Sequence, residues 1–426
     1  MTSSKPMIVA FLASLTLVGV TALAASPVAA QNRAKAAQTP AKFDVLYDVG
    51  IVPSEKSAHV AIRLGSGSSA VEWILFRLDP LRYRAIEADG EIEEVEGGLR
   101  WTPPRAGGSF RYILSIDHLR DDNSFDARCA KNWAILRGQD LVPRMRIRTT
   151  PGALSNSTLK LRLPEGWSAA LPYASQRGGR YSLDNPRTRF DRPSGWFAFG
   201  KLGVVREEID GTRISIAGPA GQGVRRMDTL ALLKWTFPAL REVFGELPER
   251  LQVVIAGDPM WRGGLSGPGS IYLHVDRPLI SGDASSPLLH EIVHSLMHAR
   301  SGEGGKWIVE GLAEYYSIAL LRRSETMAAD RFEKAMDRIR RRAAPGSTPL
   351  DGEMNGALRA KAVLVLMEVD RLIRDASAGA RSLDDLVRTL VSSDQAITLE
   401  LLRLTTREVA GKDFPDFFDR IDPAGS

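Results

Sequence analysis

Two histidines and a glutamate form the group of residues in this chain best suited to metal-assisted chemistry. His290, Glu291 and His294 stand in an H-E-x-x-H pattern, and the chain has only six histidines. On a helix, the two imidazoles lie one turn apart on the same face, where they can bind one zinc ion. Glu291 lies beside them as a candidate general base. The alternative is a pair of surface histidines on an ordinary helix.

The flanking residues predict two helices that would bring a third ligand to this pair. Ser286 and Pro287 suit a helix start, and Gly302, Gly304 and Gly305 suit its end. A second helix fits residues 306–322. The stretch from His294 to Gly302 spans about 12 Å of helix, and that from Gly304 to Glu310 about 9 Å. In an antiparallel pair, Glu310 would therefore return to the level of His294.

Three protein ligands with one position left for water is the arrangement of catalytic zinc, whereas structural zinc has four protein ligands. The sequence thus predicts one Zn²⁺ per chain, held by His290, His294 and Glu310, with Glu291 taking a proton from the water. Glu314, one turn after Glu310, is either the acceptor for a ring N–H of a ligating histidine or a solvated helix charge. His298 continues the histidine row but fits a supporting or surface position better than a ligand.

These motifs resemble those of the gluzincin zinc metallopeptidases, and most of all the glycyl aminopeptidase family. The resemblance rests on H-E-x-x-H followed by Trp307-x-x-Glu310-Gly311-x-Ala313-x-Tyr315-Tyr316. Weaker similarity covers Gly263-Gly264-Leu265, residues 161–167 and residues 361–390, the last including 381–386. It implies an N-terminal β domain before a thermolysin-like catalytic domain, with Gly263, Gly264, Leu265 and Ser266 on an edge strand that binds a peptide substrate.

Two departures from the family leave the activity open. Ser266 and Gly267 replace the acidic residue that can bind a free α-amine, so aminopeptidase and endopeptidase activity both remain candidates. Arg359 stands where the family has an oxyanion-donating tyrosine; it could still donate, and Tyr315 is another candidate donor. The same departures motivate a rival hypothesis, a zinc-containing peptide-binding or scaffold protein without catalysis. Hydrolysis of a non-peptide amide is a third.

The remaining sequence predicts an α+β protein with a β-sandwich followed by a mainly helical region. Residues 1–30 have the basic start, apolar run and small-residue cleavage site of a signal peptide, which implies a periplasmic or secreted protein without a later membrane span. Residues 31–42 fit a flexible linker. Short alternating runs predict an antiparallel sandwich over 43–220. Residues 221–345 fit the thermolysin-like domain, and residues 346–426 a helical region that completes it.

Charge and cysteine content narrow the other possibilities. The net charge is +5, and the arginines near residue 340 suit the solvated end of a helix, so we expect no nucleic-acid partner. Cys129 is the only cysteine, which excludes an intramolecular disulfide and makes a buried apolar role the preferred one. The expected partner is a peptide or protein substrate; its identity and the oligomeric state are not encoded in any pattern that we recognise.

Overall fold

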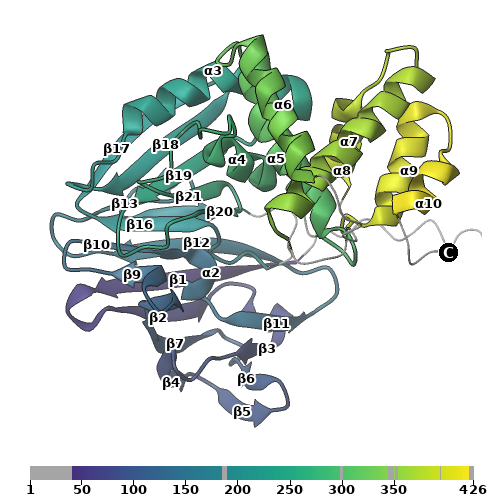
Figure 1. The fold of residues 1–426 in the computed structure, drawn as a ribbon. Helices are drawn as coiled ribbons and strands as arrows, with labels where there is room; N and C mark the ends of the chain where they lie inside the picture. Colours follow the sequence, from purple (N-terminus) through teal and green to yellow (C-terminus); the bar gives the residue numbers. More distant parts are fainter. Residues whose placement is uncertain are drawn as a thin grey trace, which may run out of the picture. The chain divides into compact units, whose positions relative to one another are not determined.

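The computed structural model describes residues 41–184, 190–297, 301–343, 350, 354–393 and 395–421. The predicted signal peptide, nearly all of the predicted linker and His298 lie outside these residues. Residues 41–426 form one compact unit, which is α+β (Figure 1). None of the helices in the described part of the chain has the length and apolarity of a transmembrane span.

The residues up to 200 form three sheets. The strand bounds, in spatial order within each sheet, are as follows: β14 (Ser175–Gln176), β15 (Arg180–Leu183), β12 (Leu154–Arg162), β1 (Lys42–Val52), β2 (Ser57–Leu64), β7 (Gly108–Ser115) and β4 (Tyr83–Ala88); β13 (Ser168–Ala170), β16 (Trp196–Gly200), β10 (Trp133–Arg137), β9 (Ser124–Cys129) and β8 (His118–Asp121); β11 (Arg144–Thr149), β3 (Val71–Arg77), β6 (Gly98–Thr102) and β5 (Glu91–Val95).

Alternation of apolar residues makes these strands two-sided. In β1, Phe43, Val45, Tyr47 and Val49 are all buried in the core of this region. The pairing is mainly antiparallel, as predicted, but β1 pairs with β12 in parallel. A tight hairpin turn can join only antiparallel strands, and parallel neighbours need a long connection. The long stretch of chain between β1 and β12 allows their parallel pairing.

A further sheet packs against the helices. Its spatial order is β17 (Leu202–Ile209), β18 (Thr212–Pro219), β19 (Arg250–Ala256), β21 (Ser270–His274) and β20 (Gly264–Gly267). The strands β18, β19 and β21 run parallel, whereas the edge strands β17 and β20 are antiparallel to their neighbours. The predicted boundary at residue 220 therefore cuts this sheet between β18 and β19, because β17 and β18 pair with each other and with β19, and not with the strands before residue 201.

The helices pack on one another and on one face of this sheet (Figure 1). They are α3 (Arg226–Phe244), α4 (Pro287–Met297), α5 (Lys306–Arg323), α6 (Ala329–Ala343), α7 (Gly356–Ala376), α8 (Leu383–Ser392), α9 (Leu399–Ala410) and α10 (Pro415–Ile421), with short turns η1 (Pro53–Glu55), η2 (Ser68–Ala70) and α2 (Gly138–Leu141) in the strand region. A proline inside a helix favours a kink or a break, but α3 continues through Pro238. The other face of the sheet meets β16 through a small core that includes Trp196 and Tyr272.

Candidate metal centre

Helix α4 presents its two histidines because its opposite face is apolar. Leu288, Leu289, Ile292 and Val293 are buried in the helical core, which leaves the histidines on the half-buried side. The Ser286 hydroxyl accepts the Leu289 N–H at 3.3 Å, the expected N-cap. At the other end, the Ser295 hydroxyl donates to the Gly267 carbonyl at 3.1 Å and fixes α4 to the edge strand β20.

Helix α5 returns past α4 and places Glu310 beside both imidazoles, as the sequence predicted. The two Nε2 atoms of His290 and His294 are 3.0 Å apart. The Glu310 carboxylate oxygens lie 3.7 Å from Nε2 of His290 and 3.5 Å from Nε2 of His294. All three residues are half-buried, and one possible ligand atom from each lies within 4.8 Å of the others.

The donor spacing fits a zinc ion. Ligands about 2.0–2.1 Å from a tetrahedral zinc lie about 3.3 Å from one another, close to the separations found here. The donor set of two imidazoles and a carboxylate is one that zinc accepts. Burial, together with the nearby His290 and Arg359, lowers the pKa of His294 to about 3, so its imidazole is neutral, as a metal ligand must be.

Glu314 faces the far side of the His290 ring. Its Oε2 is 3.5 Å from Nδ1 of His290, while Nε2 points to the other donors. A carboxylate in this position selects the tautomer with the proton on Nδ1 and leaves Nε2 free to bind metal. The alternative of a fully solvated Glu314 does not fit, because only 16% of its side chain is exposed.

Glu291 lies between the histidine pair and strand β20. A Cβ added at Gly264 would stand 2.9 Å from Cγ of Glu291 and 3.1 Å from its Oε1, so a glycine is required for this approach. Burial is the main cause that raises the pKa of the Glu291 carboxyl, against the opposing effects of His290 and of hydrogen bonds from Ser266. A half-buried carboxylate with a raised pKa is a stronger proton acceptor than a solvated one.

Arg359 reaches the same centre from the first turn of α7. Asn355 caps this helix by accepting the N–H groups of Ala357 and Leu358. The Nη2 of Arg359 lies 3.5 Å from Oε2 of Glu310, and its buried Nε has no hydrogen-bond partner among the described residues. The guanidinium therefore faces the metal centre with donor capacity to spare.

No family model matches the sequence, and no curated protein matches it. Among solved structures, the crystal structure of an aminopeptidase N family protein from Idiomarina loihiensis covers 87% of this chain and 72% of its own, with a TM-score of 0.61 and 15% sequence identity. The two chains share a fold.

Not every predicted site residue belongs to this centre. Tyr315 packs against Tyr316 at 5.0 Å between ring centroids, and the nearest charged groups that act on it are Asp370 and Arg323. It lies about 140° around the helix from Glu310, so the structure does not bring it to the ligands. Gly263 lies just before β20, where its carbonyl accepts the His274 N–H at 2.9 Å. Gly264, Leu265 and Ser266 form the predicted edge strand.

Gly311 sets the distance between α5 and α7, a role that was not predicted from the sequence. A Cβ there would stand 2.8 Å from both the Ala362 Cβ and the Leu366 Cδ1 of α7. Glycine at this point lets α5 and α7 approach closely, which places Arg359 next to Glu310. The signal was present as a glycine inside an otherwise well-formed helix pattern, directly after the predicted ligand.

Proposed function

We propose that this protein is a zinc-dependent metallopeptidase of the gluzincin type, with a thermolysin-like catalytic region. The observation that carries the proposal is the convergence of His290, His294 and Glu310 from two helices, with Glu291 beside them. The fold shared with an aminopeptidase N family protein supports it. Export to a periplasm or beyond, expected from residues 1–30, is part of the same proposal.

The residues have separate roles in hydrolysis. His290, His294 and Glu310 would hold the ion, and Glu314 orients His290. A bound zinc ion supplies Lewis acidity toward a carbonyl oxygen and toward water. Glu291 takes a proton from the attacking water and returns it to the leaving amine. Arg359 donates N–H groups to the oxygen on which negative charge grows. Strand β20 offers backbone groups to an extended peptide.

The decisive variant is Glu291→Gln, which keeps the shape of the side chain and removes the base. We expect metal analysis to find about one zinc per chain in both proteins, and peptide hydrolysis to fall at least about 100-fold in the variant. Glu333→Gln, an exposed position on α6, is the matched control and should retain activity. Retained turnover in Glu291→Gln would refute the assigned role.

A panel of peptides with free and acetylated N-termini separates the remaining candidates. Cleavage of acetylated peptides would identify an endopeptidase, and cleavage of free-amine peptides alone an aminopeptidase. Binding of zinc and peptides without cleavage would favour the scaffold hypothesis instead, which the departures at Ser266 and Arg359 motivate.

A further inference from the structure

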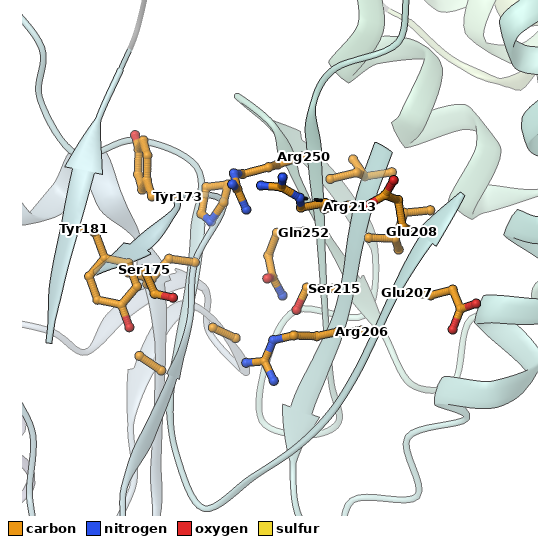
Figure 2. Close-up of a pocket in the computed structure, with 16 residues that line it drawn as sticks. Tyr173, Ser175, Tyr181, Arg206, Glu207, Glu208, Arg213, Ser215, Arg250 and Gln252 are labelled. Carbon is orange, nitrogen blue, oxygen red and sulfur yellow. Dashed lines mark ion pairs between the residues drawn. The ribbon is translucent and has the colours of Figure 1, made fainter. Parts of the chain in front are cut away.

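A second candidate site lies on the sheet formed by β17, β18, β19, β21 and β20. It is on the face of this sheet that is turned away from the helices. Part of this face is covered by Trp196 and its neighbours on β16. Beyond that cover, the strands β17, β18 and β19 and the segment from β13 to β15 line an open cavity of about 540 Å³ (Figure 2). This volume falls within the range of small-molecule sites.

The strand register arranges the polar residues of the cavity in two rows. The outer row is Glu208, Arg213 and Arg250, which stand directly opposite one another on β17, β18 and β19. Its charges are matched, because Arg213 lies 4.0 Å from Glu208 and 3.0 Å from Glu249, and Arg250 lies 3.2 Å from Glu249. This row closes one end of the cavity and has little free charge.

The inner row is Arg206, Ser215 and Gln252, again directly opposite one another on the three strands. Figure 2 shows the three side chains together in the middle of the cavity. Within the described residues, no carboxylate forms an ion pair with Arg206. The adjacent Glu207 points to the opposite face of β17, where it binds Lys234 at 2.9 Å. The inner row therefore carries one exposed positive charge that no carboxylate of the described residues pairs with.

Gln252 adds an acceptor beside this charge. The residue is 1% exposed, although it stands in the strand β19 between the apolar Leu251 and Val253. Its Nε2 donates to the Val253 carbonyl at 3.2 Å, and no donor among the described side chains reaches its Oε1. The Oε1 atom can therefore accept a hydrogen bond from a ligand.

The opposite wall is less polar. It includes Leu171, Pro172 and Tyr181, of which Leu171 is buried. Burial raises the pKa of the Tyr181 phenol, so near neutral pH this group is an uncharged donor or acceptor. The cavity thus offers a cation and an acceptor on one wall and an apolar surface on the other.

We propose that this cavity binds a small organic carboxylate that also carries an N–H group and an apolar body, the chemistry of an N-acylated amino acid. Arg206 binds the carboxylate through paired N–H groups. The ligand N–H donates to Oε1 of Gln252, and the acyl group packs on Leu171, Pro172 and Tyr181. A singly charged ligand matches the single unpaired guanidinium.

The test is calorimetric titration of the full chain with hippurate (N-benzoylglycine) at constant ionic strength. We expect saturable binding of one molecule per chain. Hippuramide lacks the charge, and O-benzoylglycolate lacks the N–H; each should bind about tenfold more weakly or worse. Arg206→Gln should weaken hippurate binding by a similar factor. Arg77→Gln, an exposed strand arginine on β3, is the matched control and should bind normally.

A further variant separates this cavity from the metal centre, which could itself attract a carboxylate. Arg359→Gln should leave hippurate binding unchanged, and a loss there would place the acid at the metal centre and overturn the proposal. The proposal is also wrong if hippurate shows no saturable binding, if hippuramide binds equally well, if Arg206→Gln has no effect, or if inorganic phosphate binds more tightly than hippurate. None of these results depends on whether the protein hydrolyses peptides.

Discussion

The orientation of His290 depends on one neighbouring carboxylate. Because Glu314 lies 3.5 Å from Nδ1 of that ring and is largely buried, its removal leaves the ring free to change tautomer. We expect Glu314→Gln to weaken zinc binding about 10- to 100-fold without loss of fold, measured by competition with a chromophoric chelator. Glu333→Gln should bind zinc normally. Unchanged affinity in Glu314→Gln would show that the contact does not orient the ligand.

Cys129 gives a prediction about pH and reactivity. The thiol is fully buried, and burial raises its pKa to about 12. Since the thiolate is the reactive form, the folded thiol stays protonated at pH 8 and at pH 9, where an exposed cysteine would ionise. We expect no reaction with a disulfide reagent in the folded protein and one thiol per chain after denaturation. Rapid labelling of the folded chain would contradict this burial.

At the scale of elements, the centre depends on how closely two helices approach. Gly311→Ala places a methyl group 2.8 Å from both Ala362 Cβ and Leu366 Cδ1, so α5 and α7 must separate. Overpacking of this kind costs about 1–3 kcal/mol, against a gain of about 1 kcal/mol from helix propensity. We expect a net loss of unfolding free energy in denaturant titrations. Hydrolysis should fall as well, because Arg359 moves away from Glu310.

Gly356→Ala is the control for this variant. Like Gly311→Ala, this variant adds a methyl group to a helix glycine, here in α7. The atom nearest to the added methyl group is Cδ of Arg342, at an ordinary 3.6 Å. Its activity should match that of the unaltered protein. Its unfolding free energy should equal or slightly exceed that of the unaltered protein. Equal behaviour of the two variants would mean that the α5–α7 contact does not set the geometry of the centre.

The same elements show how much of the site was predictable. Helical spacing and capping residues were enough to predict α4 and α5 and to bring Glu310 to the histidines, because these relations are local in the chain. The roles of Tyr315 and Gly311 were harder to predict from the sequence. Tyr315 has the chemistry of a donor, but its packing against Tyr316 decides its direction. Gly311 matters only through α7, whose distance from α5 no local pattern encodes.

For the whole molecule, the sequence predicted an α+β protein but not where its sheets divide. Alternating runs in β17 and β18 look like those of the earlier strands, and only their pairing partners distinguish them. Pairing between strands far apart in the chain is not a property of either strand alone. A boundary drawn from composition at residue 220 therefore fell between two hydrogen-bonded strands.

This sheet yields the last prediction, on two shortened chains. Residues 221–421 lack β17 and β18, so they lose Ile214 and Ile216 from the helical core and leave β19 as an edge strand. They also lose β16, which uncovers Val254 and Tyr272 on the other face of the sheet. An exposed apolar edge strand promotes aggregation. We expect this chain to be insoluble or to lack a near-UV circular dichroism spectrum, and to bind no zinc. Residues 41–421 keep the whole compact unit and should be soluble with about one zinc per chain. A soluble, zinc-binding 221–421 chain would instead mean that the helical region folds without β18, and that the pairing across residue 220 contributes little to its stability.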